Sequence, residues 1–298
     1  MTIANFVPEL WEAAVQVPFE KALVFGQPNV ANTKYEGKIQ QQGDTVHVTS
    51  VADPTIRTYD KTTDIVVEDL ADSDTAMLIN QGNYYAFRVN DVDKVQAAGD
   101  FQNPATQRAG VGLKDAVDKY IAGLYFGGAL AANQYGRATV FDGDPSKIVT
   151  GTNISAYQLL VKLREKLDNQ SVPTVGRYVV VPSQFISALL MDKRYTDLSA
   201  SGSTDGLLNG QVGRGSGFDV LVSNNIQKVG GAGANKDDLV ICAGVPDAVS
   251  FANQITETEA IRSEHRFGDL VRGLNIFGAK VFRPEGIATA TVSFTTIP

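Results

Sequence analysis

The sequence has 298 residues, of which 43% are hydrophobic and 20% are charged, and its formal net charge is −7. This length predicts about two domains with enough apolar residues for a buried core. The acidic balance argues against a protein that wraps nucleic acid tightly, because such binding depends on Lys and Arg neutralising phosphates. No apolar run is long enough to span a membrane, and the first residues lack the pattern of a signal peptide. The single cysteine, Cys242, excludes an internal disulfide and fits a reducing compartment.

The N-terminal residues 1–36 are predicted to form an arm. Apolar side chains give one short helical face, and prolines divide the segment into pieces; the apolar positions are Phe6, Leu10, Trp11, Ala14 and Val15. Such a segment cannot bury its aromatic side chains by itself. We therefore expect it to lie on a surface, either of its own subunit or of a neighbour.

Residues 37–90 have the character of β-strands. Thr45–Ser50 alternates and is rich in β-branched residues. Thr75–Ile79 and Tyr84–Val89 are predicted as two strands joined by the turn Asn80–Asn83. The polar middle, 51–64, predicts a hairpin that reaches away from any core. A long projecting hairpin is marginal alone and gains stability from a partner.

A long helix is predicted at Pro104–Phe126, after a short helix at Val92–Ala98. Apolar residues follow the spacing of one buried helical face, and the polar face holds Lys114, Asp115, Asp118 and Lys119. At about 1.5 Å per residue the long helix extends roughly 33 Å, enough to cross a domain. We interpret it as the spine of the first domain.

A compact α/β module is predicted for residues 130–254, because helical and strand patterns alternate there. The predicted helices are 156–169 and 184–190, and the predicted strands are 177–181, 218–222 and 239–242. The Ser/Gly-rich stretch 199–217 is expected to be mobile. Two closing strands, Ala279–Phe282 and Ile287–Phe294, are expected to return beside the spine helix, so that the first domain forms from two chain segments.

No residue pattern predicts catalysis, a cofactor or a metal ion. His47 and His265 are the only histidines, and neither has a second histidine at ligand spacing. Cys242 lies in an apolar strand, which predicts an inert thiol. Gly213–Gly217 lacks the spacing of a phosphate loop and predicts a turn. Acidic pairs such as Asp142 with Asp144 lack calcium-loop spacing. The residues thus predict an α+β protein with two appendages that need neighbours, which points to assembly.

The order of these segments resembles that of tailed-bacteriophage major capsid proteins with the Hong Kong 97-type fold. The motifs that carry the resemblance are Phe6–Trp11, Gly217–Val220 followed by Val222–Asn225, Arg266–Asp269 followed by Gly273-Leu274, and above all Phe277–Ala288. The likeness covers nearly the whole chain. It implies an N-terminal arm, an extended loop, the spine helix of a peripheral domain, an axial domain, and returning strands of the peripheral domain, at 1–36, 37–90, 91–129, 130–254 and 255–298.

The resemblance also implies a function and partners. Subunits would form hexamers and pentamers of an icosahedral shell around double-stranded DNA, held without sequence specificity. The family's N-terminal scaffolding segment is missing before Met1, which implies a separate scaffolding protein or prior cleavage. A portal, and a decoration protein in some relatives, would complete the partners. The protein would reside in the virion after assembly in the bacterial host cytoplasm, with no enzymatic activity, no cofactor and no membrane.

Candidate contacts between subunits follow from the two appendages. They are Arg57, Lys61, Glu68, Asp69, Asp72 and Trp11. Some relatives crosslink an extended-loop Lys to a neighbour's Asn; Lys61 lies in that region, but the motif match does not carry the chemistry over. Two alternatives stay open. One is an encapsulin-like shell around an enzyme cargo, and the other is a hydrolase or carbohydrate-binding protein with a dispersed site.

Overall fold

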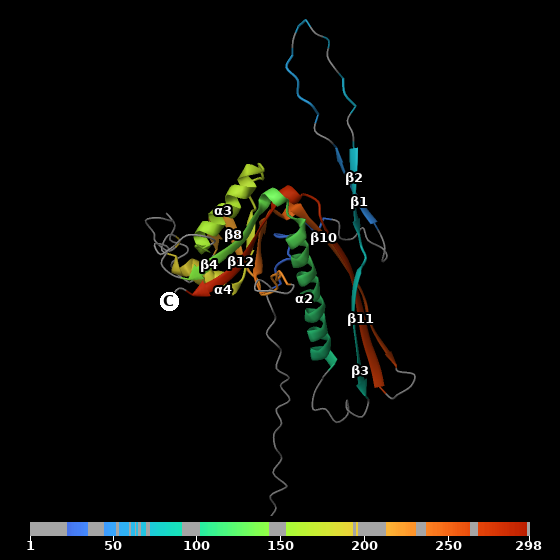
Figure 1. Cartoon of the computed structure of the whole chain (residues 1–298). Coiled ribbons are helices and arrows are strands. Elements are labelled where there is room, and N and C mark those ends of the chain that lie inside the picture. The colour runs from blue at the N-terminus through green and yellow to red at the C-terminus, as the bar shows by residue number, and fades with distance from the viewer. Residues whose placement is uncertain are drawn as a thin grey trace, which may run out of the picture.

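The structure, a computed structural model, describes most of the chain after the N-terminal segment. The described residues are 23–34, 45–51, 54–59, 61, 62, 64, 67–69, 72–90, 102–142, 153–192, 195, 213–230, 237–262 and 268–296. These residues form an α+β structure of three sheets with one long and two shorter helices (Figure 1). The predicted arm helix and the short helix at Val92–Ala98 lie outside the described residues, as does most of 199–217.

The spine helix α2 spans Gln102–Gly128, so the helix predicted from apolar spacing is confirmed. Its buried face includes Val117, Ile121 and Tyr125. The helix ends close to the sheet beside it, because a Cβ placed on Gly128 would come within 2.6 Å of a methyl group of Val281. Only glycine permits that approach without a shift.

A three-stranded antiparallel sheet lies along α2 (Figure 1). Its order is β10 (Val249–Arg262), β11 (Gly268–Val281) and β3 (Gln81–Asn90). Tyr120 of α2 packs edge-on against Phe277 of β11, with ring centroids 5.3 Å apart. Aromatic and aliphatic side chains on this face of the sheet therefore share a core with the spine helix.

A hairpin of β1 (Thr45–Val51) and β2 (Asp72–Leu78) projects beyond the rest of the subunit (Figure 1). The expected turn at Asn80–Asn83 was wrong. β2 pairs with β1, whereas β3 pairs with β11, so the chain passes from one sheet into the next without reversing. Local turn residues did not decide the outcome, because β2 pairs with the preceding strand β1, and β3 pairs with β11, which lies far away in the sequence.

A seven-stranded mixed sheet forms the second module, in the order β5-β4-β12-β9-β6-β8-β7. The strands are β4 (Gln134–Asp142), β5 (Asn153–Ile154), β6 (Tyr178–Val181), β7 (Arg214–Gly215), β8 (Phe218–Val222), β9 (Leu239–Gly244) and β12 (Ile287–Thr296). The helices are α3 (Ala156–Asn169) and α4 (Ser183–Met191), and short 3-10 turns lie at Ala131–Asn133, Pro246–Ala248 and Pro284–Gly286. The predicted helices and strands of this module are confirmed.

The seven-stranded sheet is buried on both faces. Along β6, Val179 and Val181 pack with α3 and α4, while Tyr178 and Val180 pack with α2 and residues 23–34. This alternation follows from the period of two in a strand. The sheet therefore separates two hydrophobic cores, and α2 belongs to both modules.

Strand pairing does not follow the expected division of the chain at 254/255. β10 runs without a break from Val249 to Arg262 across that position. β12 pairs antiparallel with β9 and parallel with β4, in the middle of the seven-stranded sheet. Strand formation at Ile287–Phe294 was predicted correctly, but its sheet was not, because periodicity carries no information about which edge a strand joins.

Candidate assembly surfaces

The loop of the hairpin exposes large apolar side chains. Ile56 is 96% exposed, Val67 is 86% exposed and Tyr59 is 75% exposed. These side chains offer apolar area to a second molecule, since the hairpin stands away from the subunit's own cores (Figure 1). The surface of the hairpin loop therefore has a larger apolar part than the polar sequence of 51–64 predicted.

Charged residues of the same loop already contact one another. Arg57 Nη2 lies 3.7 Å from Glu68 Oε2, and the backbone N–H of Thr55 donates to Glu68 Oε1 over 2.6 Å. The backbone hydrogen bond from Thr55, more than the Arg57 contact, lowers the pKa of Glu68. Two of the predicted subunit contacts therefore shape the loop internally.

The remaining predicted contact residues differ in their position and exposure. Lys61 and Asp69 are exposed on the loop. Asp72 begins β2, opposite Val51 in the register. Trp11 lies outside the described residues. The structure brings Arg57 and Glu68 together and leaves Lys61 and Asp69 exposed for a contact with a neighbour.

The root of the hairpin is packed firmly against β11. Met77 and Ile79 are fully buried in a small cluster with Ala252 and Ile276. A Cβ placed on Gly278 would lie 2.6 Å from the carbonyl oxygen of Leu78. The close approach and the cluster fix the direction in which the hairpin leaves the subunit.

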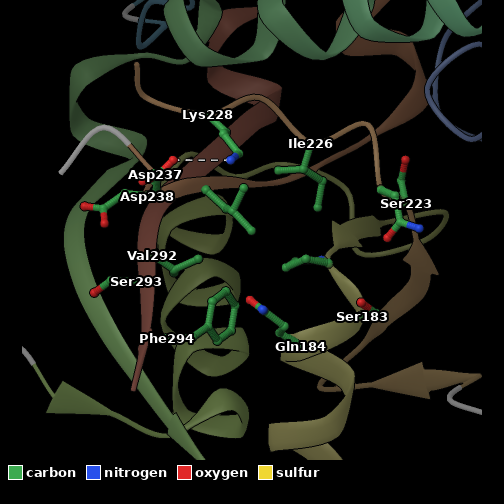
Figure 2. Close-up of a pocket in the computed structure, with 13 residues that line it drawn as sticks. Ser183, Gln184, Ser223, Ile226, Lys228, Asp237, Asp238, Val292, Ser293 and Phe294 are labelled. Atoms are coloured by element: carbon green, nitrogen blue, oxygen red, sulfur yellow. Dashed lines mark hydrogen bonds and ion pairs between the residues drawn. The ribbon is translucent and has the colours of Figure 1, made fainter. Parts of the chain in front are cut away.

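A pocket of about 520 Å³ opens in the seven-stranded module (Figure 2). Its lining residues are Pro182, Ser183, Gln184, Ser223, Asn224, Ile226, Lys228, Asp237, Asp238, Leu239, Val292, Ser293 and Phe294. Lys228 Nζ lies 3.3 Å from Asp237 Oδ1, and Arg137 Nε lies 2.5 Å from Asp238 Oδ2. Both carboxylates thus have a cationic partner. The lining contains neither histidine nor cysteine.

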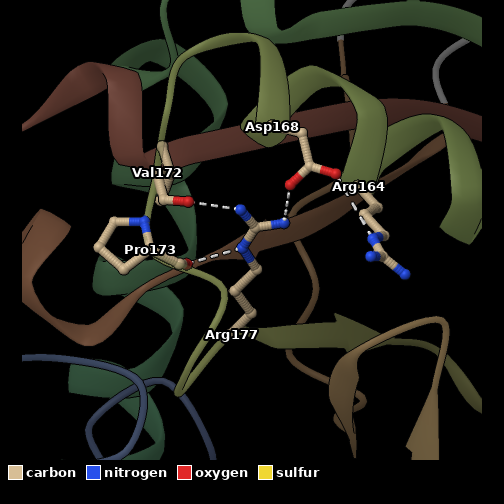
Figure 3. Close-up of polar contacts among 5 residues, drawn as sticks. All are labelled: Arg164, Asp168, Val172, Pro173 and Arg177. Carbon is tan, nitrogen blue, oxygen red and sulfur yellow. Dashed lines mark hydrogen bonds and ion pairs between the residues drawn. The ribbon is translucent and has the colours of Figure 1, made fainter.

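A buried arginine closes the loop between α3 and β6 (Figure 3). Arg177 is 3% exposed and donates to Asp168 Oδ1 over 2.6 Å, to the carbonyl oxygen of Val172 over 2.5 Å and to that of Pro173 over 2.8 Å. Arg164 lies 3.4 Å from the other oxygen of Asp168. These contacts tie the end of α3 to the loop that follows it and to the residue that precedes β6.

The buried ionisable groups are chemically quiet. Burial raises the pKa of the Cys242 thiol and, as the largest cause, the pKa values of Tyr125 and Tyr178. The two tyrosine hydroxyls form a hydrogen bond with each other. A thiol with a raised pKa is a poor nucleophile.

The predicted turn at Gly213–Gly217 is confirmed, with Ser216 and Gly217 both at positive φ between β7 and β8.

The described part of the chain has neither a metal-binding cluster nor a membrane-spanning helix. No group of three or more His, Cys, Asp or Glu side chains there could hold a metal ion. His47 instead contacts Asp74 on the hairpin stem, with Nδ1 2.5 Å from Oδ2. Among the described helices, none is both long and apolar enough to cross a bilayer.

Comparisons with known proteins identify the family. The model of the phage capsid protein family matches residues 84–290, more than half of the chain. A solved structure of Mycobacterium phage Che8 is similar over 97% of this chain and 98% of that chain, with 28% identity and a TM-score of 0.75. The capsid of the cyanophage P-SCSP1u covers 97% of this chain and 94% of its own, with 16% identity and a TM-score of 0.77. No curated protein matches the sequence.

The resemblance noted in the sequence and the predicted fold class are confirmed by these matches. A capsid of Ralstonia phage GP4 shows the same fold at 15% identity, over 98% of this chain and 97% of its own, with a TM-score of 0.66. The matches do not favour an enzyme-cargo shell or a hydrolase. The chain belongs to the phage capsid protein family and is a major capsid protein of the Hong Kong 97-type fold.

Proposed function

We propose that this major capsid protein forms hexamers and pentamers, which build an icosahedral shell around double-stranded DNA. The observation that carries the proposal is the projecting hairpin, whose loop exposes Ile56, Tyr59 and Val67 on a single subunit. A surface of this kind requires a neighbour. When two different surface patches bind each other, repeated copies of the subunit form a closed ring if the rotation from one subunit to the next divides a full turn evenly. A capsomer is a ring of this kind.

The hairpin loop lies on the adjacent subunit of the same capsomer. Its apolar side chains supply the buried area, while Lys61 and Asp69 supply charges at the edge of the contact. Each exposed ion pair adds only about 0–1 kcal/mol, so apolar burial is the larger contribution. The pairing of Arg57 with Glu68 keeps the loop in the shape that the neighbour binds.

The two modules have separate positions in the shell. The peripheral domain comprises α2 with β3, β10 and β11, and the axial domain comprises the seven-stranded sheet with α3 and α4. β12 therefore belongs to the axial domain, which shifts the expected boundary at 254/255. Residues 1–36 are the arm. The hairpin of β1 and β2 is the extended loop, and β3, which was expected to be part of it, belongs to the peripheral domain.

Other partners follow from the same function. A separate scaffolding protein, a portal and, where the phage has one, a decoration protein bind the shell during or after its assembly in the host cytoplasm. The net charge of −7 suits a shell that encloses DNA without binding it tightly. The protein has no enzymatic activity of its own.

Electron microscopy and sedimentation of the recombinant chain test the proposal. The wild-type chain is expected to give capsomers or shells, and a double variant, Ile56→Ser with Val67→Ser, is expected to stay folded by circular dichroism but to assemble poorly. Thr58→Ser, an exposed change in the same loop that removes no large apolar surface, is the matched control. A wild-type chain that stays monomeric at every concentration contradicts the assembly proposal. A double variant that assembles like the wild type contradicts the role of the loop.

A further inference from the structure

Asp118 of α2 is almost fully buried, at 1% exposure, although it carries a carboxylate. Its Oδ1 accepts hydrogen bonds from three consecutive backbone N–H groups: Val24 at 3.0 Å, Phe25 at 2.7 Å and Gly26 at 3.4 Å. These residues begin the described part of the chain directly after residues 1–22. The carboxylate thus holds the point at which the N-terminal segment meets the body of the subunit.

The second oxygen of Asp118 reaches the other module. Asn225 follows β8 and donates its Nδ2–H to Asp118 Oδ2 over 2.9 Å. The same amide nitrogen lies 2.9 Å from Asp115 Oδ1, and Asp115 is paired with Lys119 at 2.7 Å. The donors that reach Asp118 are therefore neutral N–H groups from two distant segments. A buried carboxylate is costly unless such donors satisfy it, and hydrogen bonds to a charged acceptor are the stronger kind.

The segment 23–34 is held again further along. Phe25 is fully buried and packs against Tyr125, with ring centroids 5.7 Å apart. Tyr125 Oη donates to the carbonyl oxygen of Val30 over 3.4 Å. Asn32 then forms backbone hydrogen bonds with β10, at 2.8 Å as donor and 3.0 Å as acceptor. The segment thus runs from the spine helix to β10 and is fixed at both ends.

We propose that Asp118 is a positioning residue that anchors the N-terminal arm and joins it to both modules. We call the arm anchor the set of hydrogen bonds that this carboxylate accepts from the N–H groups of Val24–Gly26 and from the side-chain amide of Asn225. The inference goes beyond the proposed shell function, because it concerns contacts within one subunit and does not depend on the hairpin contact.

Hydrogen–deuterium exchange of the full chain tests the anchor without a mutation. The amides of Val24 and Phe25 are expected to exchange as slowly as those of Ile121 and Ala122 in α2, since all four residues are buried in the same core. The amide of Gly26, whose hydrogen bond is 3.4 Å long and only partly buried, is expected to exchange faster than these but more slowly than an exposed loop. Exchange of the three amides as fast as that of an exposed loop overturns the proposal.

A substitution then tests the carboxylate itself. Asp118→Asn removes the negative charge and one of the two acceptor oxygens, so that a single neutral oxygen remains for donors on both sides. Exchange at residues 24–26 is therefore expected to accelerate at least tenfold, while residues 121–128 keep their protection. Asp115→Asn is the matched control, because it lies on the same helix and shares Asn225, whereas the N–H groups of Val24, Phe25 and Gly26 donate to Asp118. It should leave exchange at 24–26 unchanged. All chains are compared in the same assembly state, checked by sedimentation.

Three outcomes overturn the proposal. One is unchanged exchange at 24–26 in Asp118→Asn, and another is equal acceleration by Asp115→Asn. The third is a uniform loss of protection across the subunit, which would make Asp118 a residue of the general core. If Asp118→Asn does not fold, Asn225→Ala supplies the second variant. It removes one donor to the anchor, and exchange at 24–26 must then accelerate more than exchange at 121–128.

Discussion

Lys280 Nζ donates a hydrogen bond to the carbonyl oxygen of Ala76 over 2.6 Å, joining β11 to the hairpin strand β2. The two residues lie 204 positions apart in the chain. Beside this bond, the buried side chains of Met77 and Ile79 complete the junction. The hairpin is therefore held at its root by one charged hydrogen bond and a small apolar cluster.

Replacing that lysine should loosen the root of the hairpin. Lys280→Met keeps the aliphatic length but removes a charged donor, whose hydrogen bond contributes roughly 1.5–3 kcal/mol to the free energy of unfolding at most. Faster amide exchange in β2 and a lower midpoint in urea are the expected results. Lys34→Met removes a 77% exposed lysine 3.7 Å from Asp247 and should change the midpoint little. Equal effects of the two substitutions would contradict the structural role of Lys280.

The close approach at Gly278 should tolerate no side chain. In Gly278→Ala the new Cβ meets the backbone oxygen of Leu78 rather than a flexible side chain, so the sheets must separate. We expect a loss of about 1–3 kcal/mol in the free energy of unfolding, measured by urea denaturation. Gly112→Ala is the control, because nothing lies within 4 Å of its Cβ position and it sits inside α2. That change should stabilise the chain by up to about 1 kcal/mol; a neutral Gly278→Ala would show that the junction adapts.

Charge reversals in the hairpin loop should distinguish residues that maintain the loop conformation from residues that contact a neighbouring subunit. Arg57→Glu places two carboxylates together and should weaken assembly by distorting the loop, while the exchange Arg57→Glu with Glu68→Arg should restore it. Lys61→Glu should weaken assembly without a change in circular dichroism, most strongly at low salt where screening is least. Sedimentation measures assembly in each case. If the exchanged pair assembles no better than Arg57→Glu alone, Arg57 meets a neighbour directly.

The buried ionisable groups should make the subunit sensitive to alkaline pH. Burial raises the pKa values of Cys242, Tyr125 and Tyr178 in the folded state, so the folded chain keeps protons that the unfolded chain releases. Their contribution is complete below the unfolded pKa values, about 8.5 for Cys and about 10 for Tyr, and falls as the pH rises above them. Thermal unfolding should thus shift to lower temperature from about pH 8.5 upward.

A cysteine substitution isolates the first part of that pH dependence. Cys242→Ala should lower the melting temperature at neutral pH, because it leaves a small cavity, but should flatten the decline that begins near the thiol pKa. Calorimetry across the alkaline range measures both effects. An identical decline in the variant and the wild type would assign the pH dependence to other groups.

Most of the local structure follows from patterns in the amino-acid sequence. The apolar spacing of α2 and the alternation of Thr45–Ser50 each satisfy one periodicity, which depends only on neighbours along the chain. The start of α3 was equally local, since the Ser155 hydroxyl accepts from the N–H of Gln158 at 3.2 Å. The ordered set of motifs also carried the resemblance to capsid proteins, because it extended over nearly the whole chain.

Strand pairing and the burial of charged side chains depend on contacts between segments that are distant in the chain. The sequence placed Asp118 on the polar face of the spine helix, but the residue is buried, because the N–H groups that satisfy it come from a segment as many as 94 positions away. β2 and β3 were expected to pair with each other, and each took a distant partner instead. Periodicity specifies which face of an element is apolar, whereas the choice of partner depends on contacts between segments that no local pattern encodes.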